Sequence, residues 1–498
     1  MSDQGYILAI DQGTTGSTAL LINAELQVVA KANEEFRQIY PQPGWVEHDA
    51  ADIWASVEVA VTGALGQANV RPEQIRTIGI TNQRETSLLW DRESAEPIHN
   101  AIVWQCRRTS ERCAELRAAG HEELVRERTG LVLDPYFSGT KAAWTLDHVP
   151  GARERADAGQ LAFGTIDTYL VWRLTDGAHH VTDVTNASRT MIMDIHRGAW
   201  DEDLAGILNL PMAILPKIVS SSEVYGETRG VGFLPDGIPV SGIAGDQQAA
   251  LFGQACFEPG QAKSTYGTGA FVLMNTGESA PRSENGLLTT IAWKIGDGPT
   301  TYALEGSVFI AGAAVQWLRD ELKIIDAAPE VEALARSVED AGGVWVIPAF
   351  AGLGAPYWDA DARGAILGLT RGSNRGHVAR ATLEGIAHQV ADVVEAMSAD
   401  SGRSLEGLRV DGGAAANGLL MQLQADLLGT QVARSAILET TALGAALLAG
   451  LAVGFWSSTQ EITERWAADR SFAAELGSPD REIQRKSWRD MVNRVRGR

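Results

Sequence analysis

The 498-residue chain is poor in cysteine and in positive charge. Its three cysteines, Cys106, Cys113 and Cys256, form no Cys-x-x-Cys pair, so they predict neither a disulfide framework nor a metal site. Reduced thiols in a cytoplasmic protein are the better interpretation. The 42 Lys and Arg against 63 Asp and Glu give a formal net charge of −21. This charge disfavours a nucleic-acid partner, because binding to phosphates needs a basic face.

Long apolar runs are also missing. The longest spans residues 442–456, is rich in Gly and Ala, and falls short of the length that a membrane-spanning helix needs. We therefore interpret it as a buried helix packed closely on a sheet. The first residues, MSDQGYILAID, contain neither a basic start nor a long apolar stretch. The sequence thus predicts no secretion signal and no insertion into a membrane.

What the chain does contain is an ordinary globular composition, with 45% hydrophobic and 21% charged residues. Apolar runs at residues 6–10, 19–22 and 76–80 are typical of strands. Apolar residues recur at helical spacing over residues 53–64 and 380–397. Strands that alternate with amphipathic helices predict an α/β fold.

A faint duplication suggests two related α/β domains that face one cleft. Residues 7–22 and 264–275 both follow a pattern of strand, Gly/Thr turn and strand. Residues 242–253 and 409–420 both follow a pattern of strand end, Gly-containing turn and helix. We place the boundary near residues 252–258, which predicts an N-terminal domain over 1–253 and a C-terminal domain over 254–498.

The common phosphate-binding signatures are absent, since the chain has neither GxxxxGK[ST] nor a GxGxxG after its first strand. Two Gly/Thr turns stand in their place, at residues 11–18 and 266–269. Each offers backbone N–H groups and hydroxyl groups, which are donors that suit phosphate oxygens. Either turn alone is also typical of a plain hairpin. The pair, one from each half, indicates a phosphate chain held between the domains.

Charged side chains follow two of the predicted strands. Arg84 and Glu85 come after the strand at 76–80, at the end where open α/β sheets bind ligands. Together they offer donors and acceptors that suit vicinal hydroxyl groups, although a surface ion pair is the commoner role of such neighbours. Asp246 precedes a predicted helix, where it can be a general base or merely an N-cap.

Long segments of the chain resemble the FGGY carbohydrate kinases, of the actin/hexokinase/Hsp70-like ATPase superfamily. The resemblance runs from about Ile7 to Trp456 and is carried by AIDQGTTGSTA at 9–19, GWVEHD at 44–49, GITNQRET at 79–86, NAIVWQCRRT at 100–109, DPYFSGTKAAWTLDH at 134–148, GTIDTYLVWRLT at 164–175, TNASRTM at 185–191, SGIAGDQQAALFGQ at 241–254, STYGTGAF at 264–271 and VDGGAAANGLLMQLQAD at 410–426. It implies two RNase H-like, actin-like ATPase domains that flank a deep catalytic cleft.

The resemblance also implies an activity. We expect ATP-dependent, in-line phosphorylation of glycerol to sn-glycerol 3-phosphate, with Asp246 as the general base. Another polyol, a ketopentose or gluconate remains an alternative acceptor, and so does an ATP-driven binding protein of the actin or chaperone type, which has no acceptor. The positions implied to bind the acceptor are Arg84, Glu85, Trp104, Tyr136, Asp246, Gln247 and Phe271. The family further implies a homodimer or homotetramer.

ATP and Mg²⁺ are the implied cofactors. The positions implied to bind the nucleotide are Thr14, Thr15, Gly16, Thr18, Thr268, Gly312, Gln316, Gly413 and Asn417. Asp11 and Asp246 are implied to hold the hydrated Mg²⁺, which needs few protein carboxylates.

The chain departs from the family pattern in two places. Relatives commonly read TTSSR where this chain has Gly16 and Thr18, so a cation that would face the phosphates is lost. The segment 226–237 matches the region where some bacterial members bind the inhibitor fructose 1,6-bisphosphate. Residues 230–237 contain no Lys or Arg, so we expect weak or absent inhibition.

Overall fold

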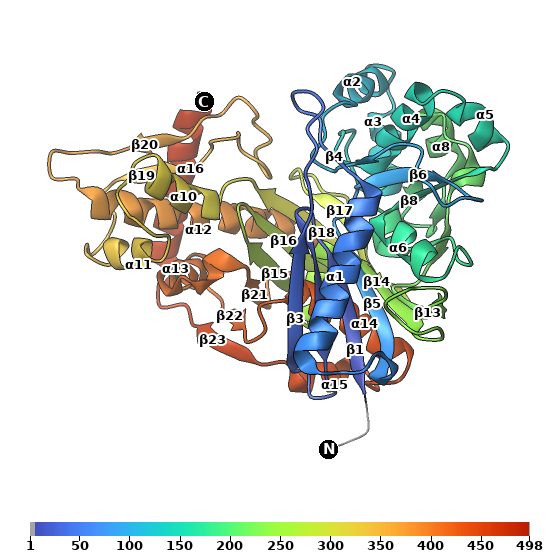
Figure 1. The fold of residues 1–498 in the computed structure, drawn as a ribbon. Coiled ribbons are helices and arrows are strands. Elements are labelled where there is room, and N and C mark those ends of the chain that lie inside the picture. The colour runs from blue at the N-terminus through green and yellow to red at the C-terminus, as the bar shows by residue number, and fades with distance from the viewer. Residues whose placement is uncertain (1–4, 498) are drawn as a thin grey trace.

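The computed structural model describes residues 5–497, which form two lobes (Figure 1). Residues 1–4 and 498, which belong to the two predicted domains, lie outside the described part, and so does the beginning of the segment from which we predict no secretion signal. A central mixed sheet organises each half of the chain. The predicted two-domain α/β architecture is therefore confirmed.

The first sheet has the strand order β13-β14-β5-β1-β2-β3. Its strands are β1 (Tyr6–Gln12), β2 (Gly16–Ile22), β3 (Val28–Glu35), β5 (Ile75–Asn82), β13 (Ser222–Glu227) and β14 (Pro239–Gly245). Strand β1 is antiparallel to β2 and parallel to β5, which in turn is parallel to β14. The carboxyl ends of β1, β5 and β14 therefore meet at one edge of the sheet.

The second sheet repeats this plan in the order β17-β18-β16-β15-β21-β22-β23. Its strands are β15 (Gln261–Tyr266), β16 (Ala270–Gly277), β17 (Leu288–Lys294), β18 (Thr300–Val308), β21 (Gly407–Asp411), β22 (Val432–Ser435) and β23 (Ala468–Phe472). Strand β15 is antiparallel to β16 and parallel to β21, as β1 is to β2 and β5.

Helices and smaller sheets complete the two lobes. The helices of the N-terminal half are α1 (Ala50–Ala68), α2 (Ser110–Ala118), α3 (Glu122–Thr129), α4 (Ser138–His148), α5 (Ala152–Asp157), α6 (Ile166–Leu174), α7 (Val184–Ala187), α8 (Glu202–Leu208) and α9 (Asp246–Gly253). Those of the C-terminal half are α10 (Gly312–Asp320), α11 (Glu330–Ala335), α12 (Arg375–Ser401), α13 (Gly418–Leu428), α14 (Thr440–Ala452), α15 (Thr459–Arg465) and α16 (Ser478–Val495). The smaller sheets are formed by β4 (Glu47–His48), β7 (Ala101–Ile102), β6 (Ser87–Asp91) and β8 (Leu161–Thr165), by β9 (Val181–Asp183) with β12 (Lys217–Val219), by β10 (Met193–Asp194) with β11 (Ala199–Trp200), and by β19 (Trp345–Ile347) with β20 (Ala365–Leu367).

The topology confirms one part of the predicted duplication and corrects the other. The hairpins β1–β2 and β15–β16 occupy equivalent central places in their sheets. Residues 242–253 and 409–420 do not correspond, because β14 is the second neighbour of β1 whereas β21 is the first neighbour of β15. By position in the sheet, β21 matches β5, and β14 with α9 matches β22 with α14. Both strands end in a glycine-bearing turn at the carboxyl edge of their sheet, so the sequence pattern could not distinguish them.

Helix α14 fulfils the prediction of a buried, closely packed helix, although it ends at Ala452. It comes from the C-terminal half yet packs on β1, β5 and β14 of the first sheet and against α9. A Cβ at Gly444 would lie 1.8 Å from the carbonyl oxygen of Ala249, and one at Gly79 would lie 2.2 Å from that of Ala445. Only glycine allows these backbones to approach so closely. Within residues 5–497, none of the helices combines the length and apolar character that crossing a bilayer requires.

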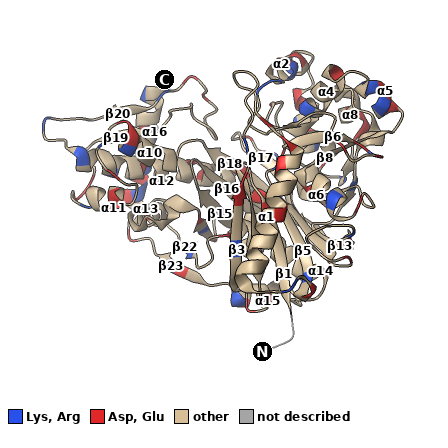
Figure 2. Ribbon diagram, in the orientation of Figure 1, with Lys and Arg blue, Asp and Glu red and all other residues tan. Residues whose placement is uncertain are grey.

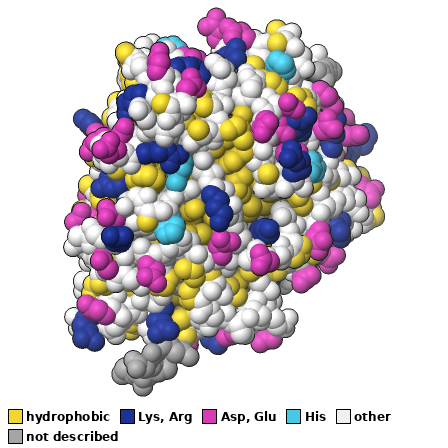
Figure 3. Space-filling view, turned by 90° about the vertical axis from the view of Figure 1, so that its right-hand side faces the viewer, with side chains coloured by type: hydrophobic (Ala, Val, Ile, Leu, Met, Phe, Trp, Pro, Cys, Tyr) yellow, Lys and Arg dark blue, Asp and Glu magenta, His cyan; other side chains and the backbone are white. Residues whose placement is uncertain are grey.

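Charged residues of both signs are distributed over both lobes (Figure 2). On the face shown in Figure 3, Lys and Arg lie next to Asp and Glu, with hydrophobic side chains between them. The excess of acidic residues is therefore not gathered into one patch on this face.

Candidate active site

The first Gly/Thr turn joins β1 to β2 and lies at the edge of the first sheet where the carboxyl ends of β1, β5 and β14 meet. The N–H of Gly13 donates to the carbonyl oxygen of Gly16 at 2.9 Å and closes the turn. A Cβ at Gly16 would lie 2.6 Å from the carbonyl oxygen of Glu34, so the neighbouring strand requires glycine there. Thr15 is exposed, and Thr14 is half-buried. Thr18 lies within β2, where its hydroxyl accepts a hydrogen bond from the Nδ2 of Asn33 at 2.9 Å.

Arg84 and Glu85 form a tight turn after β5 and are deeply buried. Their side chains are 2% and 1% exposed, which excludes the alternative of a surface ion pair. Glu85 has a φ of 61°, which is a left-handed conformation that costs free energy in a non-glycine residue and often marks a functional site. The buried amine of Lys141 donates to the carbonyl oxygens of Glu85 and Tyr136 and so supports this turn.

Two charged residues to which the sequence analysis gave no role complete this site. Glu305, on β18 of the second sheet, accepts two hydrogen bonds from Arg84 at 2.6 and 3.1 Å and one from Arg189 at 3.0 Å. Arg189 also donates to Glu85 at 2.7 Å. Burial alone would raise the pKa of Glu305, but Arg189 and Arg84 outweigh it and hold the pKa at about 2. The network therefore ties the two halves of the chain together.

Sequence signals for both residues existed. Glu305 is an acidic residue that directly follows the apolar residues 302–304 of β18, and Arg189 lies in the motif TNASRTM. The first signal is typical of a buried, paired carboxylate. Its partners could not be read from the chain, because they lie more than a hundred positions away.

Aromatic rings border the Arg84–Glu85 turn. Trp104 and Tyr136 contact edge to face, with 5.6 Å between their ring centroids. The Nη2 of Arg84 donates to the hydroxyl of Tyr136 at 3.3 Å. Phe271 comes from the second sheet, where it is paired with Ser307 on β18, two residues beyond Glu305. The structure thus brings Trp104 and Tyr136 into contact and places Phe271 along the strand pair that carries Glu305.

Asp246 opens helix α9, directly after β14. The N-cap of this helix is Gly245, so Asp246 is its first residue and not its cap. Its Oδ1 accepts from the N–H of Gln247 at 2.7 Å and lies 3.0 Å from the Nε of Arg84. The side chain remains 35% exposed, which leaves it accessible to a ligand. The buried amine of Lys263 donates to the side-chain oxygen of Gln247.

A pocket of ≈ 400 Å³ in the C-terminal half contains most of the other predicted nucleotide positions. Those that line it are Thr268, Gly312, Gln316, Gly413 and Asn417. The N–H groups of Ala311 and Ala313, at the start of α10, hold the carbonyl oxygen of Thr268 at 2.8 and 3.1 Å. The predicted positions of the first turn, residues 14–18, belong to the other sheet and do not line this pocket.

Asp11 and Asp246 have the chemistry that a magnesium site needs. Burial raises the pKa of Asp11 to about 7, and the negative charges of Asp246 and Glu439 add to the increase. Two carboxylates that repel each other favour a cation between them. In residues 5–497 no group of three or more His, Cys, Asp and Glu side chains forms a metal cluster. A pair of carboxylates fits Mg²⁺, which keeps most of its water ligands.

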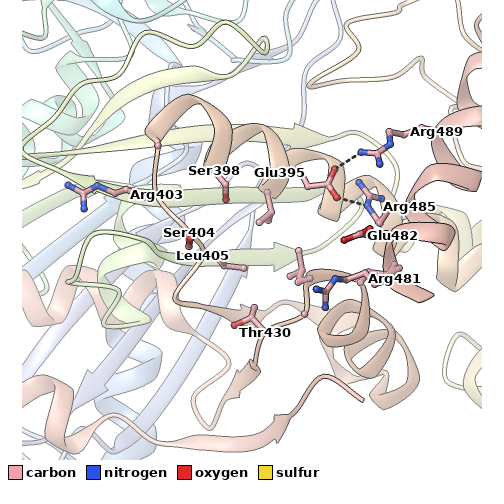
Figure 4. A pocket seen from close by; sticks show the side chains of 15 residues that line it. Glu395, Ser398, Arg403, Ser404, Leu405, Thr430, Arg481, Glu482, Arg485 and Arg489 are labelled. Carbon is pink, nitrogen blue, oxygen red and sulfur yellow. Dashed lines mark hydrogen bonds and ion pairs between the residues drawn. The ribbon is translucent and has the colours of Figure 1, made fainter. Parts of the chain in front are cut away.

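A larger pocket, of ≈ 690 Å³, lies far from these residues, between α12, α13 and α16 (Figure 4). It is lined by Arg403, Arg481, Arg485 and Arg489 together with Glu395. Arg485 and Arg489 pair with Glu395 at 2.7 and 3.3 Å. Arg403 follows the carboxyl end of α12. The guanidinium of Arg481, which belongs to α16, lies against Gly429 at the carboxyl end of α13. Cations at such ends balance the helix dipoles. Pairing and helix dipoles therefore account for these arginines.

Residues 226–237, for which we predict weak or absent inhibition, comprise the end of β13 and the loop that follows it. The N–H of Gly230 donates to the carboxylate of Asp236 at 2.8 Å, so an exposed acidic side chain closes this loop. Weak or absent inhibition by fructose 1,6-bisphosphate stays a prediction.

Comparisons with known proteins agree with this geometry. The chain is 59% identical to a glycerol kinase of Symbiobacterium thermophilum over 99% of both chains, and 56% identical to one of Desulforamulus reducens over 99% of this chain and 98% of the other. The crystal structure of Plasmodium falciparum glycerol kinase with ADP superimposes with a TM-score of 0.94 at 38% identity, covering 98% of both chains. The N- and C-terminal domains of the FGGY family of carbohydrate kinases match residues 6–253 and 262–453. The chain therefore belongs to the FGGY family of carbohydrate kinases.

Proposed function

We propose that this chain phosphorylates glycerol with ATP and Mg²⁺, giving ADP and sn-glycerol 3-phosphate. The observation that carries the proposal is the group of Arg84, Glu85, Tyr136 and Asp246 at one sheet edge. The full-length relatives named glycerol kinase, at 56–59% identity, support the same substrate. ATP is supported by the relative of known structure with ADP.

Arg84 and Glu85 are proposed to bind the vicinal hydroxyl groups of glycerol, with Gln247 as a third contact. Hydrogen bonds to Glu305 and from Arg189 already fix the two side chains, so little side-chain entropy is lost when the acceptor binds. The rings of Trp104, Tyr136 and Phe271 are proposed to cover the carbon chain. A small, rigid and polar-lined site suits a three-carbon polyol.

Asp246 is proposed to take the proton of the attacking hydroxyl. The N–H of Gln247 and the guanidinium of Arg84 hold its Oδ1, and among the described residues no side chain or N–H donates to Oδ2. That oxygen is therefore available to accept a proton. A carboxylate held in this way is oriented as a general base for phosphoryl transfer requires.

The nucleotide is proposed to lie along the pocket of Gly312, Gln316, Gly413 and Asn417, with its phosphates between the turns at residues 11–18 and 266–269. Asp11 and Asp246 would hold Mg²⁺, which neutralises charge on the phosphates when it is bound. The two turns offer N–H and hydroxyl donors to the phosphate oxygens. Two or four copies per assembly and a cytoplasmic location belong to the same proposal. The first rests on the family resemblance alone, and the second on the sparse, unpaired cysteines.

A coupled assay of ADP release, run with ATP and Mg²⁺ over a panel of acceptors, tests the proposal. We expect glycerol to give the highest kcat/KM in a panel that also contains xylulose, gluconate and longer polyols. A higher value for one of these would overturn glycerol as the substrate. ATP hydrolysis that is equally fast without any acceptor would favour an ATP-driven binding protein. The Asp246→Asn variant gives the background rate of ADP release.

A further inference from the structure

A closed ring of hydrogen bonds joins the first phosphate turn to the candidate polyol site. Its members are Thr14, Trp104, Thr86, Gln83, His48 and Gln38. The ring begins where the indole N–H of Trp104 donates to the hydroxyl oxygen of Thr14 at 2.9 Å. The backbone N–H of Trp104 donates to the hydroxyl oxygen of Thr86 at 3.1 Å, and that hydroxyl donates to the Oε1 of Gln83 at 2.9 Å.

The other side of the ring runs through His48 and returns to the turn. The Nε2 of Gln83 lies 3.2 Å from the Nδ1 of His48, and the Nε2 of His48 lies 2.8 Å from the Oε1 of Gln38. The Nε2 of Gln38 donates to the carbonyl oxygen of Thr14 at 3.0 Å. Thr14 is thus held at two atoms, its hydroxyl by Trp104 and its carbonyl by Gln38.

The donor and acceptor roles on this side follow from the amide groups of Gln83 and Gln38. Both glutamines donate through Nε2 to backbone carbonyls, which only accept, so their Oε1 atoms are acceptors. With the Oε1 of Gln38 as an acceptor, the Nε2 of His48 carries the proton. The Nδ1 of His48 is then one of three acceptors around the Nε2 of Gln83, beside the Oε1 of Gln12 at 3.1 Å and the carbonyl oxygen of Gly13 at 3.3 Å. Burial lowers the pKa of His48 to about 4, so the neutral ring that this pattern needs is present at neutral pH. Gln83, His48 and Thr86 are buried, and Thr14, Gln38 and Trp104 are half-buried, so the connected hydrogen bonds restrict the movement of the turn.

The ring has a consequence for the hydroxyl of Thr14. Because the indole N–H of Trp104 occupies one lone pair of this oxygen, the hydroxyl proton is directed elsewhere. Thr14 stands in the turn that offers donors to the phosphates. The acceptor site and the phosphate turn are therefore connected by Trp104, whose ring belongs to the first and whose N–H binds the second.

We propose that the indole N–H of Trp104 sets the orientation of the Thr14 hydroxyl toward the transferring phosphate, and that Gln83, His48 and Gln38 are positioning residues for this turn. The inference deepens the proposed function and rests on it. Contact between the acceptor and the ring of Trp104 then steadies the turn that holds the phosphates. This makes phosphate binding in the reactive position depend on the presence of the acceptor.

The Trp104→Phe variant tests the inference, because phenylalanine keeps an aromatic wall, although a smaller one, and removes the N–H together with the five-membered ring of the indole. We expect kcat/KM for ATP to fall about five- to tenfold, which corresponds to the loss of one hydrogen bond. The KM for glycerol should change less than this, and the ratio of ATP hydrolysed without glycerol to ATP used with it should rise. Trp200→Phe is the matched control, since the indole N–H of Trp200 donates to the carbonyl oxygen of Pro216, away from this ring.

A double-mutant cycle with Thr14→Val separates the bond from other effects of the ring. If the bond acts as proposed, Trp104→Phe in the Thr14→Val background costs little further kcat/KM for ATP. Independent, multiplying losses would overturn the inference, and so would a loss that falls on the KM for glycerol alone. Wild-type protein that does not phosphorylate glycerol at all would contradict the proposed function instead.

His48 provides a second readout that does not depend on Trp104. His48→Gln keeps an amide that can donate to Gln38, whereas His48→Leu removes both bonds of the ring. We expect the glutamine variant to recover part of the kcat/KM for ATP that the leucine variant loses. Equal losses that track an equal fall in melting temperature would indicate a purely structural role and overturn this part. If the leucine variant does not fold, the cycle between Trp104 and Thr14 decides alone.

Discussion

The polyol side and the nucleotide side of the candidate site in this kinase consist of different kinds of residue. The polyol side uses buried charges, with Arg84 and Arg189 each paired to both Glu85 and Glu305 at 2.6 to 3.7 Å. The nucleotide side is lined mainly by glycine, alanine and other uncharged residues around an open pocket. The first arrangement fixes side chains before the ligand arrives, and the second leaves space for the ligand to meet the backbone.

The difference follows from the two ligands. A small triol offers only hydroxyl groups, which are recognised by rigidly placed donors and acceptors. A nucleotide is large and carries its own charge, so close backbone approach and N–H groups are enough to hold it. We therefore expect substitutions on the polyol side to act by leaving buried charges unpaired. Those on the nucleotide side should act by filling space that the nucleotide needs.

The largest expected effect is that of Asp246→Asn, at the junction of the two sides. The amide cannot accept the acceptor's proton, so kcat should fall about 10³-fold while glycerol still binds. Stopped assays of ADP release and calorimetry with glycerol measure the two quantities. A variant that keeps more than a tenth of the wild-type kcat would remove Asp246 as the general base.

Glu305→Gln tests the charged side. It leaves two buried guanidinium groups without their shared carboxylate, which should lower the free energy of unfolding by about 3–5 kcal/mol. Because the pKa of Glu305 is lowered to about 2, its contribution is present above pH 4.5 and is lost as the pH falls toward 2. Urea unfolding should therefore show a smaller difference in unfolding free energy between the wild type and Glu305→Gln at pH 3 than at pH 7.

The control for this prediction is Glu123→Gln, which breaks an exposed pair with Arg282. It should leave the unfolding free energy nearly unchanged. Equal destabilisation by the two variants would mean that burial of the pair has no special weight.

Gly413→Ala tests the open side. A Cβ at Gly413 meets nothing within 4 Å, so the folded protein should accept it without a fall in melting temperature. The methyl group would instead occupy space in the nucleotide pocket, and we expect the KM for ATP to rise about tenfold. Gly412→Ala is the contrasting variant, because its φ of +86° and a contact of 2.5 Å with Tyr266 predict lost stability. An unchanged KM in Gly413→Ala would place the nucleotide elsewhere.

The smallest expected effect is that of Thr18→Arg, which restores a cation near the first turn. Thr18 is paired with Asp11 across β1 and β2, so an arginine there lies beside the proposed phosphate position. The KM for ATP should fall two- to threefold, or about 0.5 kcal/mol, as expected for one partly exposed charge. Thr62→Arg, on the exposed side of α1, adds the same charge as a control. An equal or higher KM would count against the placement of this turn.

The sequence predicted the two-domain α/β class and the helix at residues 442–456, because periodicity and glycine content are local properties. It also predicted the five positions that meet in the nucleotide pocket, although their roles there stay predictions. It could not predict Glu305 as the partner of Arg84, since the pair joins a turn of the first sheet to a strand of the second. It placed residues 242–253 opposite the wrong strand, because a turn motif carries no information on strand order.

Helix α14 has a consequence for how the chain is made. The last strand of the first sheet ends at Gly245, but the helix that covers this sheet begins only at Thr440. At the usual speed of translation, the ribosome needs about 10 to 40 s to synthesise the intervening residues. Throughout that interval the glycine-lined face of the nascent first sheet has no partner of its own, so chaperones should be found on it until α14 emerges.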